Sequence, residues 1–103
     1  MATWMNVLEI DALRDGCHQV VMSPVGAVIL FRRGEDFFAM KDMCTHDGGE
    51  LGSGVCEGDE IVCPRHGARF CVRSGAVLSA PAYEDLEACP VQLREGWVQI
   101  DVD

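Results

Sequence analysis

The chain has 103 residues, enough for one small globular domain but not for a second catalytic module. Its 17 acidic residues outnumber its 8 lysines and arginines, and the net charge of −9 argues against nucleic-acid binding and favours either a basic protein partner or simply solubility. No apolar run approaches membrane-spanning length and the first ten residues do not resemble a signal peptide, so we expect a cytoplasmic protein that does not bind membranes.

The first part of the chain is predicted to form short strands joined by turns. β-forming residues indicate strands at Trp4–Ile10, His18–Met22, Ala27–Phe31 and Phe37–Met40. Turn-forming residues separate these segments at Asp15-Gly16, Ser23-Pro24 and Arg32–Asp36. The last of these turns is typical of a hairpin loop.

The second part follows the same pattern. Strands are predicted at Glu60–Val62, Phe70–Val72, Ala76–Leu78, Val91–Leu93 and Val98–Val102. In the last two segments apolar and polar residues alternate across a turn at Glu95-Gly96, which predicts a hairpin with one buried face. With no long amphipathic helix, repeat or linker, the pattern predicts a single all-β domain over residues 1–103, either a sandwich or a barrel.

Between these parts lies the stretch from Cys44 to His66, CTHDGGELGSGVCEGDEIVCPRH. It holds two short thiol–imidazole pairs, Cys44-Thr45-His46 and Cys63-Pro64-Arg65-His66, with glycines around both. A zinc finger usually separates a cysteine pair from a histidine pair, so this mixed pattern differs from it. The pattern matches a [2Fe-2S] cluster in which two cysteines hold one iron and two histidines hold the other.

On the motifs Cys-Thr-His and Cys-Pro-x-His-Gly, the chain resembles Rieske-type ferredoxins over essentially its whole length. The resemblance implies a Rieske-type antiparallel β-sandwich with a small cluster-binding subdomain at approximately residues 42–70. It also implies one [2Fe-2S] cluster, with His46 and His66 facing the redox partner and Pro81 in a loop beside the cluster. The cofactor-binding and metal ligands that it implies are Cys44, His46, Cys63 and His66.

Too few histidines remain after the cluster ligands for a second, catalytic iron site. The resemblance extends to Rieske oxygenases, whose catalytic subunits hold a further iron with two histidines and a carboxylate. Only His18 is left, and we expect it to be a surface strand residue. We expect no nucleophilic Cys–His pair either, so the chain should carry electrons rather than act as an enzyme.

The ligand loops depart from those of respiratory Rieske proteins, which carry one further cysteine in each loop and join the two by a disulfide. Here the corresponding positions are Gly49 and Arg65, and Gly67 is followed by Ala68 instead of serine. Fewer hydrogen bonds to the cluster imply a potential of about −150 mV rather than about +300 mV. The resemblance therefore falls on the ferredoxins of bacterial aromatic-ring-hydroxylating dioxygenases.

We expect a single-electron carrier between an NAD(P)H-dependent flavin reductase and a terminal Rieske non-haem iron oxygenase. Two alternatives stay open: a Rieske-like small subunit of an assimilatory nitrite reductase-type complex, and a structural zinc module. Acids flank the ligand motifs, and we expect them to steer the protein onto basic partners, with Arg65 making the immediate rim mixed. These acids are Asp47, Glu50, Glu57, Asp59, Glu60, Glu84, Asp85 and Glu87. The four other cysteines are predicted to be small buried apolar residues: Cys17, Cys56, Cys71 and Cys89.

Overall fold

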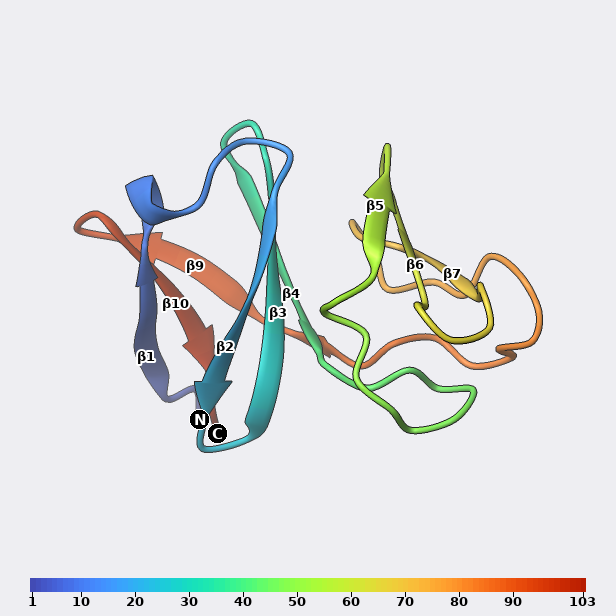
Figure 1. Ribbon diagram of the computed structural model, residues 1–103. Helices are drawn as coiled ribbons and strands as arrows, with labels where there is room; N and C mark the ends of the chain where they lie inside the picture. The colour runs from blue at the N-terminus through green and yellow to red at the C-terminus, as the bar shows by residue number, and fades with distance from the viewer.

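The computed structural model describes residues 1–103 and consists of strands, turns and one 3-10 helix of three residues (Figure 1). The elements in chain order are β1 (Trp4–Glu9), η1 (Ile10–Ala12), β2 (His18–Ser23), β3 (Gly26–Arg33), β4 (Asp36–Lys41), β5 (Val55–Glu57), β6 (Glu60–Val62), β7 (Arg69–Cys71), β8 (Ala88–Cys89), β9 (Val91–Arg94) and β10 (Trp97–Asp101). The all-β prediction is confirmed. No helix is both long and apolar enough to cross a membrane.

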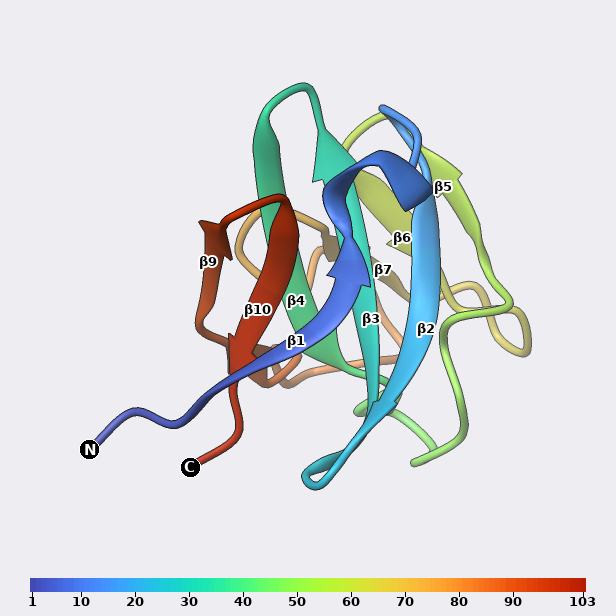
Figure 2. The ribbon, with the colours of Figure 1, turned by 90° about the vertical axis from the view of Figure 1, so that its left-hand side faces the viewer.

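The strands form three antiparallel sheets, ordered β1-β10-β9, β2-β3-β4-β8 and β5-β6-β7. The first two sheets pack face to face as a sandwich (Figure 2). The third is smaller and lies beside the four-stranded sheet, on the right in Figure 1. We call the first two sheets the sandwich, and we call β5–β7 with the loops at 42–54 and 63–87 the small lobe.

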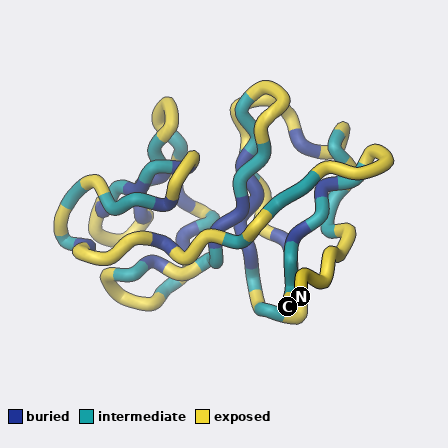
Figure 3. The backbone as a smooth tube through the Cα atoms, turned by 180° about the vertical axis from the view of Figure 1, so that it is seen from behind, coloured by how far each residue is buried: buried dark blue, intermediate teal, exposed yellow.

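Strand β3 is buried on both faces, as its continuous apolar run Ala27–Phe31 predicts. Val28 and Leu30 face the other sheet of the sandwich, whereas Ile29 and Phe31 face the small lobe, and all four side chains are fully buried. The sandwich core consists of Leu13, Val21, Val28, Leu30, Ala39, Val98 and Ile100. The second core consists of Ile29, Phe31, Met40, Cys44, Leu51, Ile61, Cys63, Ala68, Phe70, Val72, Ala82 and Leu86. Buried stretches accordingly run through the middle of the molecule, while the turns are exposed (Figure 3).

Most of the predicted strands form, but several differ in detail. Ile10 belongs to η1 rather than to the first strand, and β5 and β8, with three and two residues, were not predicted. The hairpin expected over 70–78 makes only one isolated bridge, between Phe70 and Val77. Leu93 was expected on a buried face but is 43% exposed, because β9 is an edge strand of its sheet.

The two faces of β3 can be tested with matched variants, Ile29→Ala and Leu30→Ala. Each removes a fully buried aliphatic side chain, so each should lower the free energy of unfolding by about 2–5 kcal/mol. Hydrogen exchange should distinguish them, because Ile29→Ala accelerates exchange mainly in β5–β7 and Leu30→Ala mainly in β1, β9 and β10. The same exchange pattern in both variants would contradict two separate cores.

Candidate metal centre

Cys44 and Cys63 each begin a loop that is closed by the same two backbone hydrogen bonds. The N–H of Cys44 donates to the carbonyl of Gly49 (2.8 Å), and the Cys44 carbonyl accepts from the N–H of Gly48 (2.7 Å). In the second loop the N–H of Cys63 donates to the carbonyl of Ala68 (2.8 Å), and its carbonyl accepts from the glycine before Ala68 (3.1 Å). The two ligand motifs therefore adopt the same kind of backbone loop although they differ in sequence.

A glycine occupies the same place in both loops for a conformational reason. Gly48 has a φ of 73° and Gly67 a φ of 76°, both in the left-handed region that other residues rarely adopt. Each glycine lets the chain turn back and close its loop. The glycines noted in the two motifs thus have a specific backbone role at these two positions.

Two of the four predicted ligand residues are buried and the other two are exposed. Cys44 and Cys63 belong to the second core and are 0% and 2% exposed. His46 and His66 are exposed, and their ring centroids lie 4.9 Å apart with the rings nearly perpendicular. Burial and, to a smaller extent, the neighbouring Cys63 thiol raise the pKa of the Cys44 thiol, so a thiolate here needs a nearby positive charge such as a metal ion.

Asp47 lies beside the two imidazoles without being free to act as a ligand. Potential ligand atoms of His46, Asp47 and His66 lie within 4.8 Å of one another. However, the carboxylate of Asp47 accepts two hydrogen bonds from Arg65, at 2.6 Å from Nε and 3.0 Å from Nη2. These bonds, together with one from the N–H of Gly49, hold the pKa of Asp47 well below its usual range. Asp47 is thus committed to Arg65.

Arg65 joins the two ligand loops. Besides Asp47, its guanidinium donates to the carbonyl of Glu50 (2.6 Å), so one side chain from the second loop binds two residues of the first. The guanidinium also lies against Gly49, where an added β-carbon would be only 2.6 Å from Cζ of Arg65. Gly49 and Arg65 therefore face each other, at the two positions where the resemblance places the bridging cysteines of respiratory proteins. We call this set of contacts the loop clamp.

The loop containing Pro81 lies against the first ligand loop. The Thr45 hydroxyl donates to the carbonyl of Glu84 (2.6 Å). A shallow surface hollow there is lined by Thr45, His46, Pro81, Tyr83 and Glu84. Tyr83 is 84% exposed, so a solvent-exposed aromatic residue lines the same hollow as His46. The position that the resemblance implies for Pro81 agrees with this arrangement.

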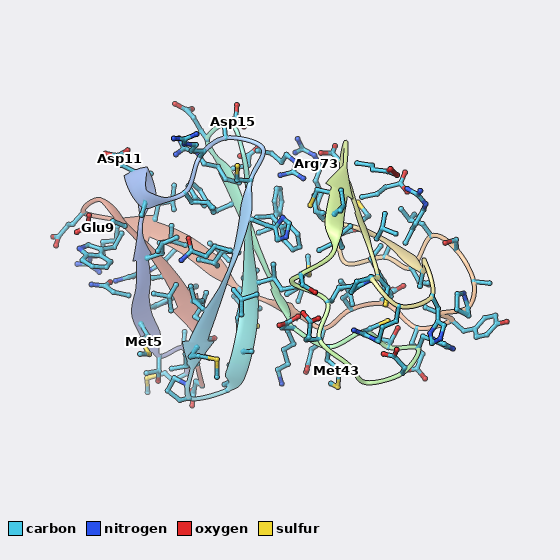
Figure 4. All side chains as sticks on the ribbon, viewed as in Figure 1. Met5, Glu9, Asp11, Asp15, Met43 and Arg73 are labelled. Atoms are coloured by element: carbon cyan, nitrogen blue, oxygen red, sulfur yellow. The ribbon has the colours of Figure 1, made fainter.

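Most of the acids flanking the motifs are paired with cations. The ion pairs are Asp47–Arg65, Glu50–Arg65, Glu57–Arg69, Glu60–Arg69, Asp59–Arg33, Asp59–Arg73 and Glu87–Lys41. Arg73 lies at the junction between sandwich and small lobe, on the opposite edge from Met43, which precedes the first ligand loop (Figure 4). Glu84 and Asp85 are the acids of this group without an ion pair, and Glu84 lines the hollow beside His46. The expected acidic field at the rim thus reduces largely to Glu84 and Asp85.

One pair of residues contradicts two expectations. His18 is half-buried rather than a surface residue: its Nε2 lies 2.9 Å from the carbonyl oxygen of Gly52 and its Nδ1 3.3 Å from Sγ of Cys56. A Cys–His pair therefore exists, although none was expected. Its members are 38 residues apart, on β2 of the sandwich and β5 of the small lobe, so no motif spacing could have indicated the pair. The other prediction for cysteines is also wrong in part, because Cys17 is exposed and Cys71 and Cys89 are half-buried.

Known proteins with the same features were found by sequence and by structure. The Rieske [2Fe-2S] domain matches residues 3–90. The ferredoxin subunit of 3-phenylpropionate/cinnamic acid dioxygenase from Shigella flexneri is 37% identical over 98 residues, covering 94% of this chain and 86% of that protein. The ferredoxin of carbazole 1,9a-dioxygenase from Nocardioides aromaticivorans superposes with a TM-score of 0.89 at 27% identity, covering 97% of this chain and 98% of that one.

A third similarity is to a chain in the solved complex of reduced oxygenase and oxidized ferredoxin of carbazole 1,9a-dioxygenase. Its TM-score is 0.86 at 32% identity, over 95% of this chain and 92% of that one. The all-β fold with paired Cys–His loops defines an iron–sulfur protein of the Rieske type. The chain belongs to the Rieske [2Fe-2S] domain family.

The loop clamp predicts a distinctive pair of variants, Arg65→Gln and Asp47→Asn. Both break the same ion pair, so both should release iron to a chelator several-fold faster than the wild type. Their reduction potentials should shift in opposite directions, because losing the Arg65 cation disfavours the added electron and losing the Asp47 anion favours it. Anaerobic redox titration and the visible spectrum during chelation measure the two effects.

Two further variants control this experiment. Glu50→Gln alters a side chain that lies 3.7 Å from Arg65 and accepts hydrogen bonds from Ser53, but it keeps the backbone carbonyl contact with Arg65, so iron release should stay near the wild-type rate. In a Gly49→Cys, Arg65→Cys double variant the guanidinium that crowds Gly49 is gone, and an oxidised disulfide should restore iron retention. Unchanged iron release in both Arg65→Gln and Asp47→Asn would contradict the clamp.

Proposed function

We propose that the chain is a cytoplasmic single-electron carrier in which Cys44, Cys63, His46 and His66 hold one [2Fe-2S] cluster. When bound, this cluster accepts and releases one electron at a time. The observation that carries the proposal is the division of the donor set, with two thiols in the second core and two imidazoles at the surface. Thiolates suit the buried side, where they are shielded from water, and imidazoles suit the exposed side, where a partner can approach.

The surroundings of the donor set support a cluster of low potential. Gly67 and Ala68 offer no hydroxyl in the second loop. The Thr45 hydroxyl in the first loop already donates to the carbonyl of Glu84. Neither ligand loop therefore offers a free side-chain hydroxyl to stabilise the more negative reduced state. The value of about −150 mV expected from sequence stays a prediction.

The relatives support the position of this carrier in an electron-transfer chain. Two of them are named as ferredoxins of aromatic dioxygenases, and one solved structure is described as a complex of oxygenase and ferredoxin. We propose that this chain likewise delivers electrons to a terminal Rieske non-haem iron oxygenase. We further propose that it receives them from an NAD(P)H-dependent flavin reductase, and that it transforms no substrate itself.

The proposed ligands predict the composition of the purified protein. We expect it to be red-brown, with about two irons and two acid-labile sulfides per chain. His46→Ala or His66→Ala should lose or distort the cluster, whereas His18→Gln should keep the full iron content because His18 is not a ligand. Metal analysis, sulfide analysis and electron paramagnetic resonance of the reduced protein measure this. A colourless protein with stoichiometric zinc would show that the structural zinc alternative is right.

The hollow beside His46 predicts how the carrier docks. Glu84→Gln should lower the rate of electron transfer to the oxygenase about twofold at low salt and flatten its dependence on ionic strength, because a long-range attraction is lost. Tyr83→Ala should weaken binding at all salt concentrations, because it removes exposed contact area instead of charge. Stopped-flow kinetics with purified oxygenase separate the two effects.

Glu57→Gln is the matched charge control for this prediction. Glu57 is also a glutamate, but it is paired with Arg69 at 2.7 Å and does not line the hollow. In the Glu57→Gln variant, the rate of electron transfer to the oxygenase should depend on ionic strength as it does in the wild type. If Glu57→Gln and Glu84→Gln give the same curve, the hollow is not the docking site.

A further inference from the structure

The pair formed by His18 and Cys56 lies outside the donor set and connects the two parts of the molecule. His18 is on β2 of the sandwich, whereas Cys56 is on β5 of the small lobe. Both side chains are half-buried, and the imidazole packs near the ring of Phe31, with centroids 5.7 Å apart. Cys56 belongs to neither ligand motif, so its thiol has no role in the proposed function.

The hydrogen bonds of His18 fix its tautomer. Its Nε2 lies 2.9 Å from the carbonyl oxygen of Gly52, and a carbonyl oxygen can only accept, so Nε2 carries a proton. Its Nδ1 then faces Sγ of Cys56 at 3.3 Å either as the acceptor of the thiol proton or, having taken that proton, as a donor to the thiolate. The geometry suits proton transfer from sulfur to nitrogen without movement of the ring.

A second cation supports the thiolate. Burial opposes ionisation of Cys56, but the hydrogen bond and charge of His18, with a smaller contribution from Arg33, lower the pKa of the thiol. The same hydrogen bond with Cys56 raises the pKa of His18. Arg33 is held nearby because its guanidinium binds the carboxylate of Asp59 and donates to the carbonyl of Gly58 (3.0 Å). Both shifts move the pair toward thiolate and imidazolium, relative to the isolated side chains.

We propose that Cys56 is a reactive thiol that is reversibly modified by small disulfides of the glutathione type. Its thiolate attacks one sulfur of the disulfide, a new sulfur–sulfur bond forms to Cys56, and the bond within the reagent breaks. The other half of the reagent leaves as a thiolate, and the proton that His18 took from Cys56 returns through solvent to protonate it. The disulfide is itself the oxidant, so no electron passes through the metal centre. The adduct lies between β2 and β5, where sandwich and small lobe meet.

None of the other cysteines combines access to solvent with an imidazole partner. Cys44 and Cys63 are buried and belong to the donor set. Cys17 is exposed but has no imidazole partner. The hydroxyl of Ser74 lowers the pKa of the Cys71 thiol without an imidazole, and burial raises the pKa of the Cys89 thiol. Cys17 and Cys71 are therefore internal references for reactivity at Cys56.

The test uses the cluster-loaded protein and iodoacetamide as the probe. Alkylation rates are measured cysteine by cysteine by mass spectrometry at neutral pH and divided by the rates in the unfolded, reduced chain. Cys56 should react at least about tenfold faster than Cys17 on this scale, although Cys17 is more exposed. His18→Gln keeps an N–H donor for the Gly52 carbonyl but has no basic nitrogen, so it should slow Cys56 about tenfold and leave Cys17 and Cys71 unchanged.

The second part of the experiment uses oxidised glutathione. The wild type should gain one glutathione adduct at Cys56, which dithiothreitol removes, and Cys56→Ser should gain none at that position. An unchanged visible spectrum shows that the variants keep their fold and cluster. If Cys56 is no faster than Cys17 in the wild type, or if His18→Gln leaves the rate at Cys56 unchanged, the proposal is wrong.

Discussion

Burial of β3 on both of its faces is the constraint on which the rest of the structure depends. The strands of the small lobe have three residues each, too few to bury a core of their own. Ile29 and Phe31 add two fully buried side chains to the second core from the sandwich, while Val28 and Leu30 belong to the sandwich core. The core beneath the ligand loops therefore includes one face of a strand whose opposite face is packed in the sandwich.

The second core also decides the chemistry that the ligand loops can support. Cys44 and Cys63 are part of it, so their sulfur atoms are shielded from water on the inner side of the loops. His46 and His66 follow them on the outer turns and are exposed. One side of the donor set is thus insulated by protein and the other is open to a partner, which is the asymmetry that an electron carrier requires.

Charged side chains have two roles in this molecule: short-range ion pairs within it and long-range attraction of a partner. The net charge of −9 suggests a uniformly acidic surface, but close to the donor set most acids are neutralised by arginines or a lysine. Arg65 and Arg33 use such pairs to tie together segments that are distant in sequence. What remains for long-range attraction near His46 is chiefly Glu84 and Asp85. The distribution of charge, rather than its sum, therefore determines how a partner approaches.

The sequence alone determined the features that depend on neighbouring residues. Alternating and continuous apolar runs predicted most of the strands, and the short Cys–His spacings predicted the donor set, because strand faces and tight turns are properties of adjacent positions. Only the tertiary structure decided which residues far apart in the sequence come into contact. Asp47 and Arg65 are 18 residues apart and His18 and Cys56 are 38 apart, and each pair meets only when separate elements pack together. Such contacts leave no hydrophobic periodicity or motif spacing in the sequence. The distance between the two side chains depends instead on how the separate elements pack on a common core.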